Sequence, residues 1–316
     1  MPRFSRSIPL LVGALCALLA VPAQAVSSRT YVASYGSDAN TTYSCDFAHP
    51  CRTFAVAFSQ VTTGGEVLAV DGSGYGTITI DRSVSIVANP GVFAGVGVFG
   101  GATGVTIATP GVTVTLRGLT INGQGGNVGV SMTSGTKLSI ENCVIANFSG
   151  STQTGVYVAT AATVRVVNSV IRDNFYGLWL QGGATADISS SKFLGNSSEG
   201  IYAVGNTAST TTTASISDTT VTGSAYGIDA YSVNASAIAQ IYVIRSTVSN
   251  GGLGINAETV AGTAYVGVSE SMIAGNSSYG LSQNGAGATL ESLGNNTVRK
   301  NALGATFGTI TTVLTQ

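Results

Sequence analysis

A repeated motif constrains the fold of this chain more than any other feature. In NSVIRDNFYGLWL, residues 168–180, an apolar pair follows an asparagine, and a glycine followed by Leu-Trp-Leu comes a few residues later. From residue 112 onward, related units contain LRGLTI, ENCVI, VNSVI, SSSKF, SDTTV, IRSTV, SESMI and GNNTV, each followed by Gly129, Gly155, Gly177, Gly200, Gly227, Gly254, Gly280 or Gly304. These glycines are 22 to 27 residues apart. Self-similarity at this period predicts a solenoid.

Each repeat unit alternates apolar and variable residues twice, which is the periodicity of a strand with one buried face. VRV at 164–166 and LWL at 178–180 show the two alternations, and VI at 170–171 is a third apolar site between them. Three short strands per coil would close a parallel tube. A leucine-rich repeat needs a leucine-heavy consensus, which is missing here, and a left-handed hexapeptide helix needs a more regular period.

The sequence resembles the right-handed parallel β-helix proteins of the pectate-lyase-like superfamily, whose coils vary in length at their turns. The resemblance covers nearly all of the chain after residue 25 and implies an all-β fold, a right-handed single-stranded parallel β-helix solenoid with a short N-terminal helical cap. The stretch YVASYGSDAN…CDFAHPCRTFAVAFSQVTTGGEVLAVDGSGYGTITI resembles the cap of exported bacterial β-helix proteins of unassigned role. Within it, Phe54, Phe58 and Val61 have helical spacing. We expect the cap and first coils over 26–111 and regular coils over 112–316.

The first 25 residues have the pattern of a secretory signal peptide. Arg3 and Arg6 precede an apolar run over 8–21, and a small-residue site permits cleavage after Ala25. The apolar run is short for a membrane span, and no later stretch is apolar enough to be one. We therefore expect the protein to be secreted, periplasmic or held at the cell surface.

Three cysteines follow the predicted signal peptide. Export to an oxidising compartment and their closeness in sequence predict a disulfide between Cys45 and Cys51. Cys143 lies among apolar repeat residues, so we expect it to be a buried thiol.

The charge of the chain limits its partners. Charged residues form only 9% of the sequence, against roughly a quarter in ordinary globular domains. Without Arg3 and Arg6, 11 basic residues face 14 acidic ones, and the basic residues form no cluster. This composition argues against binding to nucleic acid or to an anionic membrane surface.

Asparagines recur at two fixed places in the repeat. The first set contains Asn142, Asn168 and Asn295, and the second contains Asn147, Asn174, Asn196, Asn276 and Asn301. Because asparagine tolerates left-handed backbone and hydrogen-bonds its neighbours, we expect both sets to be structural columns in turns.

The carboxylates are too dispersed along the repeat to indicate a catalytic centre. A calcium-dependent lyase needs several converging carboxylates and a base, and a polygalacturonase-type hydrolase needs two or three carboxylates within about 5 to 10 Å. Here the acids fall in different columns, and motifs such as Gly-His-Gly are missing. We therefore expect no metal and no cofactor. One charged pair, Arg165 and Asp187, occupies equivalent positions in successive coils, either as a surface ion pair or as a uronate-binding, proton-abstracting pair.

Aromatic residues occupy the same outward position after the repeat glycine in three successive units. Along the chain this position contains Ser131, Tyr157, Trp179, Tyr202, Asp229, Asn256, Ser282 and Thr306. An aromatic column of this kind stabilises a sheet through cross-strand contact, or offers an exposed platform for sugar rings. The tyrosines directly before their glycines, which either extend the column or cover turns, are Tyr176, Tyr226 and Tyr279.

These patterns lead to three hypotheses of function. The first is a non-catalytic exported protein that binds a polysaccharide, a cell-surface glycan or another surface partner through the aromatic column and the polar Asp229 and Asn256. The second is a polysaccharide lyase, or a hydrolase, that acts on an acidic polysaccharide through Arg165 and Asp187. The third is a structural or self-associating cell-surface element.

Overall fold

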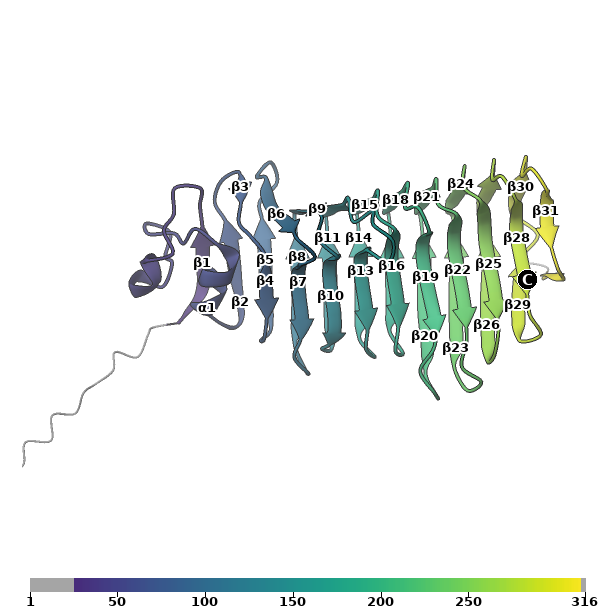
Figure 1. Cartoon of the computed structure of the whole chain (residues 1–316), viewed down its shortest axis with the longest axis horizontal. Coiled ribbons are helices and arrows are strands. Elements are labelled where there is room, and N and C mark those ends of the chain that lie inside the picture. Colours follow the sequence, from purple (N-terminus) through teal and green to yellow (C-terminus); the bar gives the residue numbers. More distant parts are fainter. Residues whose placement is uncertain (1–25, 314–316) are drawn as a thin grey trace, which may run out of the picture.

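The chain folds into a long tube of parallel strands stacked coil upon coil, with the cap at one end and the final coil at the other (Figure 1). The computed structural model describes residues 26–313, so the predicted signal peptide lies outside the described residues. Its helices are η1 (Asn40–Tyr43), a 3-10 turn, and α1 (Phe54–Ser59). Neither helix is long and apolar enough to cross a bilayer.

Three parallel sheets form the walls of the tube, which confirms the predicted fold class. Sheet A contains β1 (Ser27–Val32), β2 (Val61–Ala69), β5 (Val84–Ala88), β8 (Thr113–Arg117), β11 (Lys137–Glu141), β14 (Thr163–Val167), β17 (Thr185–Ser189), β20 (Thr211–Ser217), β23 (Ile238–Ile244), β26 (Thr263–Ser269), β29 (Ala288–Ser292) and β32 (Ile310–Thr312). Sheet B contains β3 (Ser73–Gly74), β6 (Ala94–Phe99), β9 (Leu119–Gln124), β12 (Val144–Ala146), β15 (Val170–Arg172), β18 (Lys192–Leu194), β21 (Thr220–Thr222), β24 (Thr247–Ser249), β27 (Met272–Ala274) and β30 (Thr297–Arg299). Sheet C contains β4 (Ile78–Ile80), β7 (Thr103–Ala108), β10 (Val128–Ser134), β13 (Thr154–Ala159), β16 (Tyr176–Gln181), β19 (Glu199–Gly205), β22 (Tyr226–Ser232), β25 (Leu253–Thr259), β28 (Tyr279–Asn284) and β31 (Gly304–Phe307).

The repeat glycine is required because successive coils approach closely at the start of sheet C. A Cβ atom added to Gly177 would lie 2.4 Å from the carbonyl oxygen of Gly200, and one added to Gly254 would lie 2.4 Å from that of Gly280. No side chain fits at such a distance from backbone. The apolar residues that alternate along the strands point inward and form one continuous core.

In the first asparagine set, Asn142 and Asn168 have left-handed backbone and Asn295 Oδ1 accepts from the backbone N–H of Glu270 at 3.0 Å. The second asparagine column satisfies buried turn amides from coil to coil, as predicted. The Oδ1 atom of Asn174 accepts a hydrogen bond from the backbone N–H of Phe148 at 3.1 Å, and that of Asn196 accepts from the backbone N–H of Asn174 at 3.2 Å. The placement of Asn147 in this column was wrong. Phe148 occupies that place, and Asn147 lies one residue earlier with left-handed backbone (φ 68°).

A parallel column of hydroxyl groups was not predicted. Each hydroxyl accepts the backbone N–H of the equivalent residue in the preceding coil, and the acceptors are Ser169, Ser191, Thr219, Ser246 and Ser271. Cys143 holds the first place in the column, and its thiol is buried as expected. These bonds tie the turns between sheets A and B together along the tube.

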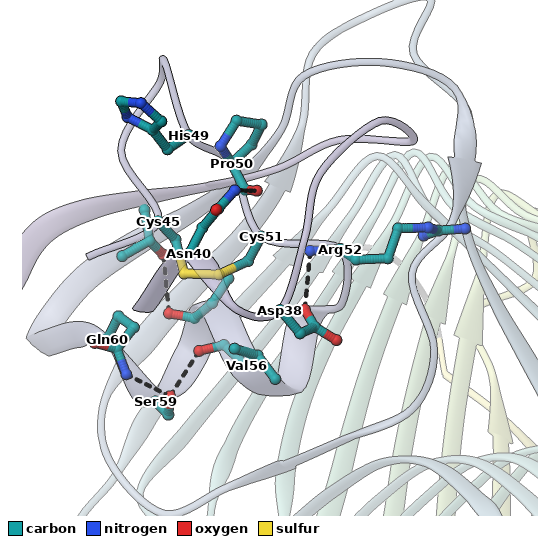
Figure 2. The surroundings of a disulfide bond; sticks show 12 residues. Asp38, Asn40, Cys45, His49, Pro50, Cys51, Arg52, Val56, Ser59 and Gln60 are labelled. Atoms are coloured by element: carbon teal, nitrogen blue, oxygen red, sulfur yellow. Dashed lines mark hydrogen bonds between the residues drawn. A yellow bond between two sulfur atoms is a disulfide. The ribbon is translucent and has the colours of Figure 1, made fainter. Parts of the chain in front are cut away.

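The cap covers the N-terminal end of the core. Cys45 and Cys51 form the predicted disulfide, with their Cα atoms 5.0 Å apart, in a loop beside α1 (Figure 2). The Oδ1 atom of Asp38 accepts hydrogen bonds from the backbone N–H groups of Arg52 and Thr53, both at 2.9 Å, and so fixes the chain where the disulfide loop leads into the helix.

The predicted cap helix is confirmed at α1 for Phe54 and Phe58, but it ends at Ser59, and Val61 is the first residue of β2. The Oγ1 atom of Thr53 caps α1 by accepting from the backbone N–H of Val56 at 3.3 Å. Phe54 and Phe58 are buried on the face of α1 that contacts β1, β2 and β4. The helix thereby shields the apolar end of the solenoid from water.

Candidate functional site

The outward position after the repeat glycine forms one column across sheet C, as predicted. Tyr157 on β13 pairs with Trp179 on β16, which pairs with Tyr202 on β19. The ring centroids of Tyr157 and Trp179 lie 5.3 Å apart, and those of Trp179 and Tyr202 lie 5.8 Å apart. Asp229 on β22 and Asn256 on β25 continue the column. The structure therefore places all five residues on one face.

The last member of the predicted column was wrong. Ser282 on β28 pairs with Phe307 rather than with Thr306, and Tyr279 pairs with Gly304. Gly304 therefore occupies the position that directly precedes the repeat glycine in the other coils. The pairing in the final coil is shifted by one residue from the register that the repeat glycines predict.

The aromatic column is half-buried and is not the exposed platform that the sequence suggests. Tyr176 packs against Trp179 with ring centroids 4.8 Å apart and stacks on Tyr202 at 5.9 Å. Tyr231 stacks on the other side of Tyr202 at 6.2 Å. The indole Nε1 of Trp179 is covered and has no hydrogen-bond partner within residues 26–313. Tyr176 therefore extends the aromatic face, which is one of its two predicted roles.

Asp229 and Asn256 are buried although they occupy outward positions, with exposed fractions of 4% and 2%. The Nδ2 atom of Asn256 donates to Asp229 Oδ1 at 3.0 Å and to Glu258 Oε2 at 3.2 Å. Burial raises the pKa of the Asp229 carboxyl well above its usual range, although the hydrogen bond from Asn256 opposes this shift. Asp229 thus holds the amide of Asn256 in place from beneath the surface.

Three carboxyl groups face the same part of sheet C, although the sequence places them in different columns. They belong to Glu199, Asp229 and Glu258 on the adjacent strands β19, β22 and β25. The charges of Glu199 and Glu258 both contribute to the raised pKa of Asp229. Burial also raises the pKa of Glu199, whose Oε2 atom has no hydrogen-bond partner in the described part of the chain.

The sequence contained a signal for this group. In three consecutive coils, Glu199 directly precedes the repeat glycine, Asp229 follows it by two residues, and Glu258 follows it by four residues. These positions belong to different columns. Reading adjacent columns together would have brought Glu258 beside Asp229, because residues two apart on a strand share a face, but not Glu199.

No positive charge compensates this acidic group in the part of the chain that the structure describes. The ion pairs between residues 26 and 313 involve other acids. The described strands of sheet C contain no lysine or arginine. Across the same residues, no group of three or more His, Cys, Asp or Glu side chains is arranged to hold a metal ion.

A cavity of about 230 Å³ lies beside the acidic group, near the C-terminal end of sheet C. Its walls are formed by Tyr226, Leu253, Asn256, Glu258, Ser278, Tyr279, Ser282, Asn284 and Phe307. Asn284 Nδ2 donates to Glu258 Oε1 at 3.3 Å, so amide groups of two strands hold the Glu258 carboxylate. Tyr226 and Tyr279 line this cavity and thus also extend the face.

Arg165 and Asp187 lie on sheet A, away from the column. They pair in register on β14 and β17, as their equivalent positions in successive repeat units predict. The predicted ion pair between them does not form among residues 26–313, because the guanidinium of Arg165 lies 3.8 Å from the carboxylate of Glu141, which also pairs with Arg117 at 2.8 Å. Arg165 thus belongs to a surface ion-pair group that runs along sheet A.

Comparisons with known proteins agree with this architecture. A family model described as right handed beta helix region matches residues 68–213 and 103–257, which together exceed half of the chain. A solved structure, described as the crystal structure of pectate lyase Pel9A, aligns with a TM-score of 0.60 and 15% identity over 88% of this chain and 80% of that one. Likeness at this identity concerns the fold alone. A search of curated proteins found no match. On the family match and the three parallel sheets, the chain belongs to the right-handed β-helix family.

Proposed function

We propose that the outer face of sheet C binds a glycan, with Tyr157, Trp179 and Tyr202 as the contact surface. The observation that carries this proposal is the continuity of the face, since the rings on three adjacent strands lead directly to Asn256 and the cavity beside it. Aromatic rings present apolar area with polar tips, which suits the faces of sugar rings. The column from Tyr157 to Asn256 spans four strand spacings, about 19 Å, so it offers an extended contact.

The charge of the face favours a neutral or cationic glycan over an acidic one. Glu199, Asp229 and Glu258 lie on strands without lysine or arginine. A polyuronate laid along this column would bring further carboxylates towards Glu258 and would make ionisation of the buried Glu199 and Asp229 carboxyls still less favourable. This argument weighs against the hypothesis of a lyase or hydrolase for an acidic polysaccharide acting on this face.

Binding would take place outside the cytoplasm. The disulfide between Cys45 and Cys51 suits an oxidising compartment, as does the signal peptide predicted from the sequence. Glycans of the cell surface and of the surroundings are the ligands available there.

Fluorescence titration with neutral oligosaccharides tests the proposal, because Trp179 is the only tryptophan in the chain. Binding should change its emission. Since one aromatic contact contributes about 0.5–1.5 kcal/mol, Tyr157→Ala and Tyr202→Ala should each weaken binding roughly two- to tenfold. Tyr242→Ala is the matched control, because Tyr242 is 43% exposed on sheet A. Binding that survives both column variants, or that is lost equally in the control, contradicts the proposal.

Glycoside hydrolysis is a second candidate, favoured by the bond network around Asn256. One nitrogen of Asn256 lies within 3.2 Å of an oxygen from both Asp229 and Glu258, so these oxygens are no more than about 6 Å apart. Paired carboxyls at comparable separations act as acid and base, or acid and nucleophile, in glycosidases. Release of reducing ends from neutral polysaccharides, lost in both Asp229→Asn and Glu258→Gln, would support this function. Intact polysaccharide after prolonged incubation would leave binding as the function.

A further inference from the structure

The cavity at the end of the column combines negative charge with an unpaired acceptor. Glu258 lines it, and the carboxylate is oriented by Asn256 Nδ2 at 3.2 Å and Asn284 Nδ2 at 3.3 Å. Neither bond neutralises its charge, and within residues 26–313 Glu258 forms no ion pair. The carboxylate is therefore available to pair with a positively charged group that enters the cavity.

A second, independent feature is the buried side chain of Asn256. It lines the cavity, is only 2% exposed, and its Oδ1 atom has no hydrogen-bond partner in the described part of the chain. Both of its neighbouring carboxylates are bound through Nδ2, so the amide nitrogen is committed and the oxygen is the unmatched atom. An unsatisfied buried acceptor is costly, and a donor on a ligand in the cavity is a group that could satisfy it.

Aromatic rings form the remaining wall of the cavity. Tyr226 is the first residue of β22, the strand that contains Asp229. Tyr279 packs on Phe307 with ring centroids 5.2 Å apart. Rings beside a desolvated cation attract it through their quadrupoles, by about 0.5–2 kcal/mol. A carboxylate, an unpaired amide oxygen and aromatic rings together form the surroundings that suit an ammonium group.

We infer that this cavity binds the protonated amine of an amino sugar, so that the ligand of the sheet C face is an aminated glycan. The inference rests on the proposed glycan-binding function, because the aromatic column continues into the cavity through Asp229 and Asn256. The ammonium would donate to Glu258 and to Asn256 Oδ1, while neighbouring sugar rings lie on the column. An N-acetylated sugar loses the charge and so loses this interaction.

The test compares three hexasaccharides that differ only in the group at one carbon of each sugar ring. The protein is titrated at pH 6, where an ordinary amine is protonated and an ordinary carboxyl is ionised, with β-1,4-linked hexamers of glucosamine, N-acetylglucosamine and glucose. Trp179 emission and calorimetry report binding. The glucosamine hexamer should bind about tenfold more tightly than the other two, as expected for one charge-assisted pair.

Glu258→Gln should remove this preference, because glutamine keeps the size and the acceptor oxygen but not the charge. The matched control is Glu291→Gln on sheet A, where Glu291 is also half-buried and accepts from Tyr265 Oη at 2.8 Å. This variant should keep the full preference. Raising the salt concentration should weaken the preference of the wild-type protein and leave glucose-hexamer binding nearly unchanged.

The outcomes separate the two proposals. Equal binding of all three hexamers, or a preference that persists in Glu258→Gln, overturns the amine site and leaves glycan binding in place. Failure of every hexamer to bind overturns both. If a short lysine peptide competes as strongly as the glucosamine hexamer, the cavity recognises cations in general and the amino-sugar assignment is wrong.

Discussion

Replacing Asn196 with alanine removes the central link of a buried hydrogen-bond column. The side chain is completely buried, and its Oδ1 atom accepts from the backbone N–H of Asn174 at 3.2 Å and from Asn174 Nδ2 at 3.0 Å. Its own Nδ2 donates to the backbone carbonyl of Ile171 at 3.1 Å. Alanine cannot replace any of these three bonds.

The expected loss follows from the groups left unpaired. The N–H of Asn174 loses its acceptor in a site that is 1% exposed, whereas Asn174 Nδ2 retains a weaker bond to the carbonyl of Ile145 at 3.4 Å. A buried unsatisfied group costs about 1–3 kcal/mol and a lost hydrogen bond about 1 kcal/mol. Asn196→Ala should therefore lower the free energy of unfolding by roughly 2–4 kcal/mol.

Ser224→Ala provides a matched control in the same column. Ser224 is 2% exposed, but its Oγ atom has no hydrogen-bond partner in the part of the chain described. Its removal should change stability by less than about 1 kcal/mol. Urea unfolding followed by circular dichroism and by Trp179 emission measures both variants. Equal midpoints for Asn196→Ala and Ser224→Ala would refute the view that shared hydrogen bonds stabilise the coils.

Three further predictions concern the cysteines and Asp229. Replacing Cys45 and Cys51 with serine should lower the free energy of unfolding by about 2 kcal/mol, as should reduction of the wild-type protein; unchanged stability would count against a constraining disulfide. Burial raises the pKa of Cys143 to about 11, so the folded protein should not react with a thiol reagent at pH 8, and rapid labelling would contradict the buried site. Burial also raises the pKa of Asp229, so its contribution to stability is present below about pH 4 and is lost as the pH rises through the folded-state value. Asp229→Asn should therefore gain thermal stability relative to the wild-type protein as the pH rises from 4 to 8, and a difference that does not vary with pH would contradict the raised pKa.

The sequence predicted the fold well because the repeated residues are those that the backbone of each coil requires. The glycine recurs because the next coil leaves no room for a Cβ atom, and the apolar alternation recurs because each strand has one buried face. These requirements also placed Tyr157, Trp179 and Tyr202 in one column. The register of the final coil was predicted wrongly because Gly304 occupies a different position in its coil from the earlier glycines.

The candidate site was predicted only in part. Alternation along a strand predicts which way a side chain points, but not how deeply its neighbours bury it. Asp229 and Asn256 point outward, yet neighbouring side chains bury them. The acidic group was missed because Glu199 and Glu258 lie in columns other than that of Asp229. Residues two apart on a strand share a face, which places Glu258 beside the column of Asp229 and Asn256. Glu199, three residues before Tyr202 in that column, would face inward by strict alternation, so its place beside Asp229 is evident only from the three-dimensional arrangement of the strands.

A crystal structure of the protein with a bound hexasaccharide tests the central claim most directly. The account predicts sugar rings lying over Tyr157, Trp179 and Tyr202 on the outer face of sheet C, with the ligand continuing towards Asn256. A hexasaccharide held on sheet A or sheet B, with the three rings untouched, would contradict it.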